Sequence, residues 1–529
     1  MKVESRYRAV SDAESRARGD RVVAWLRDYA ERRINSRLID ERRTIPPYVA
    51  LDFGNQGLMG VQVEEKYGGL ALRNREVARV LEQAAGIDLA LGTWLLVCLF
   101  PGVRPIAAFA QDGFKNEVLP RLAAGRVLAG YAQTEPGAGT NFAAMTARAE
   151  SRPGGGWSLS GDKVWIGNSA WAGVLTAMAH EVGSDGRRRG LTALAVRVDA
   201  PGVVLGRELL SMGMRGVLQG EVGFRGVEVP PEQLLGEREK GLEVGVDSMC
   251  WSRFAIAATC VGAMKRAAQI MLRFAGRRSI ATGRLLDHPV TRRVLGETVA
   301  QVALAESLLY RVADVVDSGR GVSVDLFSAC KVVGSEFLWE TADRLVQVLG
   351  SRGYDEANLA PQLLRDARVT RIFEGTTEAL VAYIGSQALI PTSDVYAWLR
   401  DELGAEAEAD ALADAVRGMR ARGGDLPRPW QCALAGHAAL WALLAAAAAR
   451  DVARRSDERD ARTAAWAHSR FASACACAAS GSEDERMLVA PAEAEAAIAV
   501  YADAIGDVEQ QLPGGREELD PLLRRVPPA

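Results

Sequence analysis

The pattern of apolar and polar positions divides the chain into four regions. In region 1–130, segments such as DRVVAWLRDYAERRI carry apolar residues at spacings of three and four, which predicts amphipathic helices. In region 131–240, short alternating runs such as LTALAVRV are separated by glycine and proline, which predicts half-buried strands with tight turns. The helical period returns in region 241–390, in runs such as SRFAIAATCVGAMKRAAQIMLRFAGRR, and predicts a bundle of long helices.

The last region, 391–529, follows a linker at IPTSD and is rich in alanine, glutamate and arginine. It predicts an additional helical domain. At 529 residues the chain is too long for one compact core. We therefore expect an α+β protein, mostly α: an N-terminal helical domain, a middle antiparallel β domain, a C-terminal four-helix bundle and an extra helical domain at the end.

Composition narrows the classes of partner. The chain is 48% hydrophobic and 25% charged with a net charge of −3. This near balance of charges gives no indication that the protein binds nucleic acid. The charged N-terminus lacks the apolar stretch of a secretory signal. The apolar run at 438–449 is shorter than the roughly 18 residues of a membrane span. Its arginine-rich flank leaves a helix at a membrane surface as an alternative, but a packed core helix is favoured.

Cysteine and histidine usage indicates a reducing compartment and no metal. The seven cysteines are scattered and odd in number, and the one residue between Cys475 and Cys477 is not a zinc spacing. The four histidines lie far from one another in the sequence. We expect reduced thiols, a cytoplasmic location and no metal site.

The stretch RIFEGTTEAL places one carboxylate, Glu374, between Phe373 and Gly375. One interpretation is a helix start, with Gly375 as the cap and Glu378 in the first turn. The other is a general base: a carboxylate against Phe373 is partly desolvated, which raises its pKa toward neutral pH. Gly375 would then let a substrate approach the backbone closely.

Three glycine-containing stretches accompany it: YAQTEPGAGTNFAAM, GDKVWIGNSAWA and QVLGSRGY. Taken singly, each has a structural interpretation: an interdomain loop, a core tryptophan at Trp165, and a helix C-cap at Gly350. None matches the GxGxxG of a dinucleotide-binding βαβ unit or a phosphate-binding loop, so neither of these folds is supported.

Taken together and in this order, the stretches resemble the acyl-CoA dehydrogenase family of flavoproteins. The family pattern TEPxAGSD, GxKxWITN, RxxFG, QxxGGxGY and LRDARxxxIxEGTxE is matched by TEPGAGTN, GDKVWIGN, RSIATG, QVLGSRGY and LRDARVTRIFEGTTE. The resemblance covers about residues 40–390. The C-terminal region is similar in position to the extra helical domain of the very-long-chain members.

The resemblance implies FAD as the cofactor and a role for each matching residue. Glu374 aligns with the base that takes the α-proton of an acyl thioester while the β-hydrogen leaves as hydride. Thr140 aligns with a residue that touches both flavin and substrate, and Arg253 and Gly375 align on the substrate side. Flavin or FAD contacts are implied for Tyr131, Thr134, Trp165, Gly167, Arg278, Gln347, Gly350, Thr376 and Glu378. Of these, Arg278, Gln347 and Gly350 are expected to reach FAD across a subunit interface.

Several positions depart from the family pattern. Gly167 replaces a threonine whose hydroxyl donates to the flavin N5, Ala281 stands where a phenylalanine stacks on adenine, and Ser351 replaces a second glycine. Ser252 stands where some members carry their base on a helix, which leaves Glu374 as the candidate.

The implied function is α,β-dehydrogenation of an acyl thioester, with medium to long chains favoured. The carrier is CoA or an acyl carrier protein, and the electron acceptor is an electron-transfer flavoprotein or oxygen. The missing hydroxyl at Gly167 keeps a flavin oxidase or monooxygenase as an alternative, and a non-catalytic flavoprotein partner as another. A homo-oligomer, dimer or tetramer, is expected.

Overall fold

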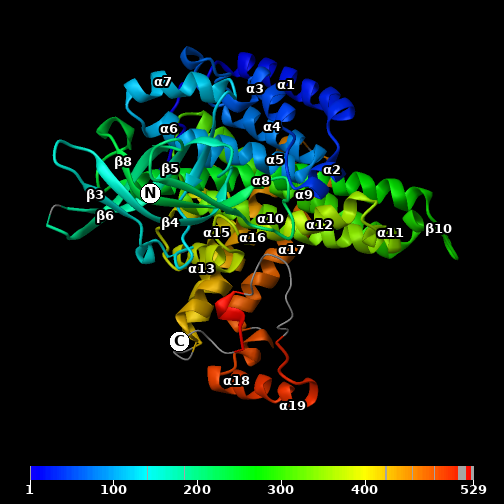
Figure 1. Cartoon of the computed structure of the whole chain (residues 1–529). Coiled ribbons are helices and arrows are strands. Elements are labelled where there is room, and N and C mark those ends of the chain that lie inside the picture. Colours follow the sequence, from blue (N-terminus) through cyan, green and yellow to red (C-terminus); the bar gives the residue numbers. More distant parts are fainter. Residues whose placement is uncertain are drawn as a thin grey trace.

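The computed structural model describes residues 2–139, 141–183, 185–422, 426–455, 457–481, 483–509 and 520–525. A helical layer, a sheet and a helical bundle follow one another along the chain, and a further helical region extends from the bundle (Figure 1). The predicted fold class is confirmed.

The N-terminal layer consists of helices with short connections. Asp88 shows how the sequence divides them, since its carboxylate accepts a hydrogen bond from the Leu91 backbone N–H at 2.7 Å and so caps a new helix. A π-helical segment, Cys98–Val103, contains Pro101. The helices are α1 (Asp12–Arg33), α2 (Ser36–Arg42), α3 (Pro47–Asn55), α4 (Asn74–Ile87), α5 (Leu89–Val97), α6 (Arg104–Phe109) and α7 (Asp112–Ala123).

The central sheet has the strand order β7-β8-β4-β3-β5-β6-β9, with β2 beside β5. Most pairs are antiparallel, as expected, but β5 runs parallel to β2 and to β3, so the sheet is mixed. Alternating polarity places a residue on a face but does not specify the neighbouring strand. The strands are β2 (Leu128–Ala132), β3 (Arg148–Ser151), β4 (Trp157–Gly167), β5 (Ala172–Val182), β6 (Arg188–Arg197), β7 (Val203–Glu208), β8 (Gln219–Val229) and β9 (Leu234–Leu235).

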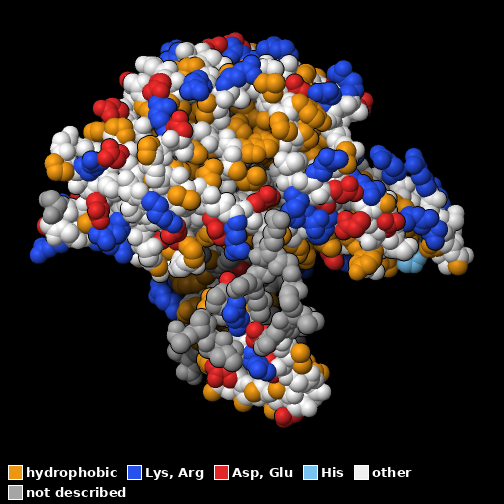
Figure 2. Space-filling model, in the orientation of Figure 1, with side chains coloured by type: hydrophobic (Ala, Val, Ile, Leu, Met, Phe, Trp, Pro, Cys, Tyr) orange, Lys and Arg blue, Asp and Glu red, His pale blue; other side chains and the backbone are white. Residues whose placement is uncertain are grey.

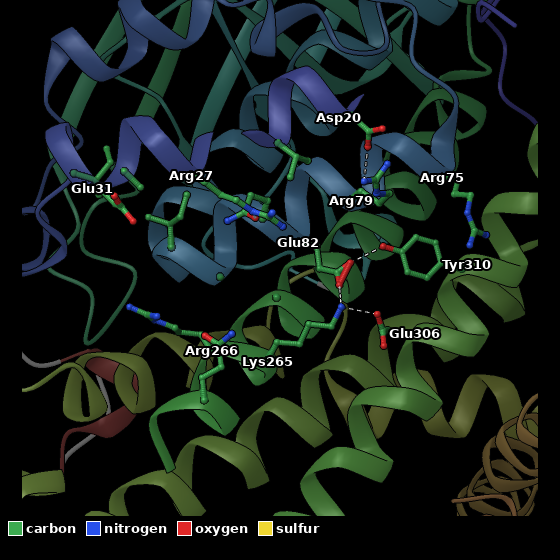
Figure 3. A pocket seen from close by; sticks show the side chains of 18 of the residues that line it. Asp20, Arg27, Glu31, Arg75, Arg79, Glu82, Lys265, Arg266, Glu306 and Tyr310 are labelled. Carbon is green, nitrogen blue, oxygen red and sulfur yellow. Dashed lines mark hydrogen bonds and ion pairs between the residues drawn. The ribbon is translucent and has the colours of Figure 1, made fainter. Parts of the chain in front are cut away.

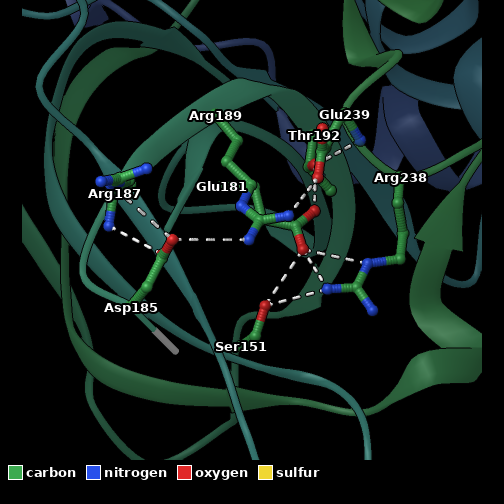
Figure 4. A network of polar contacts seen from close by, with 8 residues as sticks. All are labelled: Ser151, Glu181, Asp185, Arg187, Arg189, Thr192, Arg238 and Glu239. Carbon is green, nitrogen blue, oxygen red and sulfur yellow. Dashed lines mark hydrogen bonds and ion pairs between the residues drawn. The ribbon is translucent and has the colours of Figure 1, made fainter. Parts of the chain in front are cut away.

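A polar network ties the sheet to the segment that precedes the bundle (Figure 4). The buried carboxylate of Glu181 accepts hydrogen bonds from Ser151 Oγ at 3.0 Å, Thr192 Oγ1 at 2.9 Å and Arg238 Nε at 2.9 Å. Burial acts to raise the pKa of Glu181, but these donors outweigh it and the pKa is lowered. The buried charge is therefore fully partnered and fixes β5 against the chain entering α8.

The bundle is built around α8, in which every residue from Cys250 to Met264 is buried. This helix lies between α4 of the N-terminal layer and α10 of the bundle, which explains its nearly continuous apolar sequence. A short hairpin, β10 (Ser279–Ile280) and β11 (Gly283–Arg284), joins it to the next helix. The bundle helices are α8 (Gly241–Arg277), α9 (Pro289–Asp317), α10 (Val324–Leu349), α11 (Ser351–Tyr354), α12 (Leu359–Thr370) and α13 (Thr377–Ala388).

The C-terminal region is helical and is packed on the bundle through α16 (Arg428–Arg455). Two segments, Leu89–Phe109 and Arg428–Arg454, are long and apolar enough for a membrane span, but 94% and 72% of their apolar windows are buried in the protein. Both are therefore accounted for as core helices. The remaining helices are α14 (Asp394–Ala397), α15 (Glu406–Ala421), α17 (Glu458–Ser480), α18 (Pro491–Ala499) and α19 (Tyr501–Ile505).

The tip of this region carries exposed apolar side chains. Helices α18 and α19 lie at its end in Figure 1, and Ile498, Tyr501 and Ile505 are exposed. Figure 2 shows apolar side chains at the same tip. At the other end of the chain, β1 (Lys2–Val3) pairs with β12 (Val322–Ser323), which anchors the N-terminal segment at the start of α10.

Candidate active site

The connection between α12 and α13 has an unusual backbone. Glu374 has a φ of +55° and Gly375 a φ of +100°, so two consecutive residues lie in the left-handed half of conformational space. Left-handed conformations are uncommon for residues other than glycine, and such strain is found repeatedly at functional sites. Thr376 then caps α13, since its side chain accepts from the Ala379 backbone N–H at 3.3 Å. The cap of α13 is therefore Thr376 and not Gly375, the cap that the helix-start interpretation predicted, while Glu378 does lie in the first turn.

Two cations hold this turn from the bundle side. Arg253 Nε donates to the backbone carbonyl of Glu374 at 3.0 Å, and Lys331 Nζ donates to that of Gly375 at 2.7 Å. Both side chains are buried, and Arg253 also donates to Ser328 Oγ at 3.1 Å. Arg253 is the residue that the family resemblance places on the substrate side, and here its guanidinium donates to the Glu374 carbonyl and to Ser328.

The carboxyl of Glu374 is tuned toward neutral pH. Burial raises its pKa to about 7, against the opposing charges of Arg253 and Lys331. A carboxylate with such a pKa is a stronger base than an exposed glutamate and is still largely ionised slightly above neutrality. Phe373 is partly buried against the core, as expected for a side chain that shields the carboxyl from water.

The TEPG stretch is fixed by a buried ion pair. Glu135 and Lys163 lie 2.8 Å apart with side chains almost inaccessible. Lys163 also donates to the Gln133 carbonyl at 3.0 Å, and Glu135 accepts from the Ala147 N–H at 3.0 Å. The loop that carries Thr134 is therefore bound to β4. Sequence reasoning overlooked both charges; their signal was two opposite charges inside glycine-rich and apolar motifs.

Tyr131 lies on β2 and its hydroxyl donates to Gln133 Oε1 at 2.8 Å. Burial raises its pKa, and the negative charges of Glu374 and Asp247 raise it further. The phenol is therefore within electrostatic range of Glu374. A Cβ on Gly245 would lie 3.5 Å from the phenol oxygen, so α8 packs directly against this residue.

Trp165 is not a core residue. Its side chain is 54% exposed although it lies on a central strand, and its φ is +60°. A register shift in β4 between Lys163 and Ile166 turns this position out of the regular alternation. A large aromatic side chain held outward from a strained strand provides a surface for a planar ligand.

Gly167, two residues further, is confined by the N-terminal layer. A Cβ at this position would lie 2.8 Å from Val97 Cγ1 of α5. The space that a threonine would need is therefore filled by a stiff, β-branched side chain. Gly167 thus stands where the family pattern has threonine, and Val97 packs against its backbone in the space of the missing side chain.

The residues expected to bind FAD across a subunit interface, Arg278, Gln347 and Gly350, lie far from the Glu374 turn. Arg278 ends α8, whereas Arg253 contacts the Glu374 turn 25 residues earlier on the same helix. At a rise of 1.5 Å per residue, that separation is roughly 37 Å. Gln347 and Gly350 lie at the same end as Arg278, as the contact of Arg352 with the Phe274 ring shows. The structure thus places these predicted residues in two groups, one beside the interior of α8 near Arg253 and one at its C-terminal end.

The other predicted residues are placed as follows. Thr376 and Glu378 both follow the Glu374 turn, and Glu378 is exposed at the start of α13. Thr140 lies outside the residues that the structure describes. Ser252 Oγ is buried and has no hydrogen-bond partner among the described residues.

A groove of about 1030 Å³ lies between α1, α4, α8 and α9, away from the α12–α13 connection (Figure 3). Many of its charges are already paired: Lys265 Nζ contacts Glu306 at 2.5 Å and also Glu82, and Arg79 contacts Asp20 at 2.7 Å. The size of this groove alone therefore does not identify it as the reactive site.

Comparison with known proteins identifies the family. Family models match residues 19–126 as the acyl-CoA dehydrogenase N-terminal domain, 130–227 as its middle domain and 239–389 as its C-terminal domain. The very-long-chain specific acyl-CoA dehydrogenase of Rattus norvegicus is 30% identical over 63% of the chain and 51% of its own length. Cyclohex-1-ene-1-carbonyl-CoA dehydrogenase of Geobacter metallireducens is 30% identical over 70% of the chain and 97% of its own length.

Solved structures show the same fold. An acyl-CoA dehydrogenase from Bacillus anthracis, complexed with FAD, superimposes with a TM-score of 0.74 at 22% identity over 94% of this chain and 92% of its own. A prolyl acyl carrier protein oxidase superimposes with a TM-score of 0.66 at 24% identity over 71% and 99%. The chain spans about half the length of the very-long-chain relatives that it matches. On the three matched domains and these relatives, the chain belongs to the acyl-CoA dehydrogenase family.

Proposed function

We propose that this protein is an FAD-dependent enzyme that introduces an α,β double bond into an acyl thioester. The observation that carries the proposal is the turn at Glu374, where a carboxyl with a pKa near 7 is held in a strained backbone by two buried cations. Medium to long acyl chains on CoA are the favoured substrates, and the matched family and its named relatives support this class.

The residues present fit a bound flavin. Trp165 exposes a broad aromatic surface, and Tyr131 and Thr134 lie on the β2 end and the adjoining loop, which the Glu135–Lys163 pair fixes. When bound, FAD would accept the β-hydrogen of the substrate with its electron pair. The protein's part is to position both partners and to exclude water between them.

Glu374 would take the α-proton on one of its carboxylate oxygens. An α-C–H bond beside a thioester is a weak acid, so a base with a raised pKa lowers the barrier to proton transfer. Among the residues that the structure describes, no backbone acceptor is found for the Glu374 N–H. We propose that this N–H donates to the thioester carbonyl as charge develops there. Gly375 provides room for the thioester at this point.

The two groups of predicted FAD contacts support a homo-oligomer. Arg278 lies roughly 37 Å along α8 from Arg253, which contacts the Glu374 turn, and Gln347 on α10 lies at the same end as Arg278. One flavin can meet both groups only if the distal one comes from another copy. We therefore propose at least a dimer in which each FAD is shared between copies, and a cytoplasmic location, which the free thiols of the seven cysteines support.

Two alternatives rest on particular features. Gly167 lacks the side chain that family members place beside the flavin, which favours reaction with oxygen, and a fold relative is named as a carrier protein oxidase. A flavin oxidase, or an enzyme acting on an acyl carrier protein, is therefore the second candidate. A non-catalytic flavoprotein is the third, and the intact Glu374 argues against it.

Anaerobic titration of the purified holoprotein with saturated acyl-CoAs tests these functions. The flavin band should bleach with one range of chain lengths, and Glu374→Gln should retain the yellow colour without bleaching. Slow re-oxidation in air supports a dehydrogenase, and rapid re-oxidation with peroxide supports an oxidase. Colour without bleaching by any acyl-CoA or acyl carrier protein would contradict the proposal.

A further inference from the structure

We infer that Lys331 is a positioning residue for the reaction, which keeps the Glu374 turn in its left-handed conformation and Glu374 available as the base. The inference rests on the proposed function. Lys331 lies on α10, 43 residues before Glu374 in the chain, and no motif in the sequence indicates it.

Lys331 is fully buried, which is rare for a lysine. Its side chain is among the largest fully buried ones in the protein, and its Nζ donates to the Gly375 carbonyl at 2.7 Å. Arg253 donates to the preceding carbonyl, that of Glu374, at 3.0 Å. Two consecutive carbonyls are thus bound by two buried cations, and these bonds fix the two peptide planes that meet at Gly375.

The conformation needs such support. A non-glycine residue with a positive φ costs about 1–3 kcal/mol unless the surroundings hold it. Thr376 caps α13 on one side of the turn, and α12 ends at Thr370 on the other, so the backbone between them is short. Without the bond to Gly375, only Arg253 would hold the turn to the bundle, and the Glu374 N–H and carboxyl would be held less firmly.

The charge of Lys331 also acts on Glu374. Burial lowers the pKa of Lys331 to about 8, while Glu374 and Glu336 act to raise it and Arg253 to lower it. Cys260 faces the ammonium from α8, and burial raises the pKa of its thiol to about 12, so it is neutral. At pH 7 Lys331 is therefore mainly protonated, and its charge lowers the pKa of Glu374 below the value that burial alone would give.

Replacing Lys331 by methionine tests this role, because methionine has a similar length and no donor. Lys265→Met is the matched control, since Lys265 lines the surface groove between α4, α8 and α9. We expect K331M to keep the flavin and to reduce it about 10- to 100-fold more slowly, as misplaced catalytic groups do. We also expect the rate to reach half its maximum at a higher pH than in the wild type.

Lys331→Gln separates the two effects. Its amide can donate to a carbonyl without charge, so it should recover part of the rate but keep the displaced pH profile. A K331M protein with the wild-type rate and pH profile would overturn the inference, even if it unfolded more easily. Wild-type protein that no thioester reduces would instead overturn the proposed function, so the two failures are distinguishable.

A second measurement needs no flavin. The pKa of Lys331 is about 8 in the folded protein against 10.5 in the reference state. The unfolded state therefore binds more protons between these values, and the stability of the wild type relative to K331M rises with pH across that interval. Urea unfolding of both apoproteins at pH 7.5 and 10 measures this difference. A difference that does not change with pH would contradict a desolvated ammonium beneath the turn.

Discussion

At the scale of single residues, burial of the candidate base Glu374 favours its reactivity and reduces the stability of the folded protein. The pKa of Glu374 is about 7 in the folded protein against 4.5 in the reference state, chiefly through burial. The folded state therefore binds more protons between these values, and this carboxyl reduces stability as pH rises through that interval. Functional sites commonly show this opposition between activity and stability.

The Glu374→Gln variant should therefore be inactive and yet more stable at pH 8. The gain in the free energy of unfolding should diminish as pH falls through 7 and disappear below about 4.5, where the wild-type carboxyl is neutral in both states. Urea unfolding of both apoproteins over this range measures it. An unchanged difference from pH 5 to 8 would show that Glu374 is not desolvated.

Val97 explains why Gly167 cannot be restored alone. A threonine would place its Cβ 2.8 Å from Val97 Cγ1, so Gly167→Thr should destabilise the protein by about 1–3 kcal/mol. Adding Val97→Ala removes the clash and should recover most of that loss. If the missing hydroxyl governs oxygen reactivity, the double variant should re-oxidise more slowly in air than V97A alone. Stopped-flow re-oxidation and thermal unfolding check both statements.

At the scale of elements, α13 links the candidate base to the C-terminal region. This helix begins directly after the Glu374 turn and crosses α16 at two glycines. A Cβ on Gly385 would lie 1.7 Å from the Cys432 carbonyl oxygen, and one on Gly436 would lie 2.1 Å from that of Val381. The backbones are thus in direct contact, and the region beyond residue 390 supports the helix on which the turn rests.

Gly385→Ala should consequently weaken both stability and reaction. The added methyl meets backbone on α16, so the helices must separate, and overpacking of this kind costs about 1–3 kcal/mol or more. Flavin reduction should slow because the start of α13 shifts. Gly296→Ala is the control: it lies within α9 with no heavy atom within 4 Å of the new Cβ, and it should be neutral or more stable. Equal melting temperatures for the two variants would contradict the close backbone contact between α13 and α16 at Gly385.

At the scale of the whole molecule, the order of helical layer, sheet and bundle was predictable because the hydrophobic period changes where the architecture changes. The parallel pairing of β5 with β2 and β3 was not predictable, because the alternation of apolar and polar residues does not indicate which strands are adjacent. Glu374 was predicted because its motif is local. Lys331 and Lys163 were missed because a single lysine in an apolar stretch is usually interpreted as a solvent-exposed residue. Their hydrogen-bond acceptors, Gly375 and Glu135, are also remote from them in the sequence.

The sharing of one flavin between copies has a decisive test at this scale. Arg278→Glu should lose FAD contacts in the neighbouring copy, and Glu374→Gln should lose the base in its own, so each variant alone should be inactive. In a mixed dimer, one site combines the intact Glu374 of the first variant with the intact Arg278 of the second. Random pairing makes half of the dimers mixed with one working site each, which predicts about a quarter of the wild-type activity. Co-expression with two affinity tags isolates the mixed species. Complete inactivity of that species would show that Arg278 acts within its own chain, or not on the flavin.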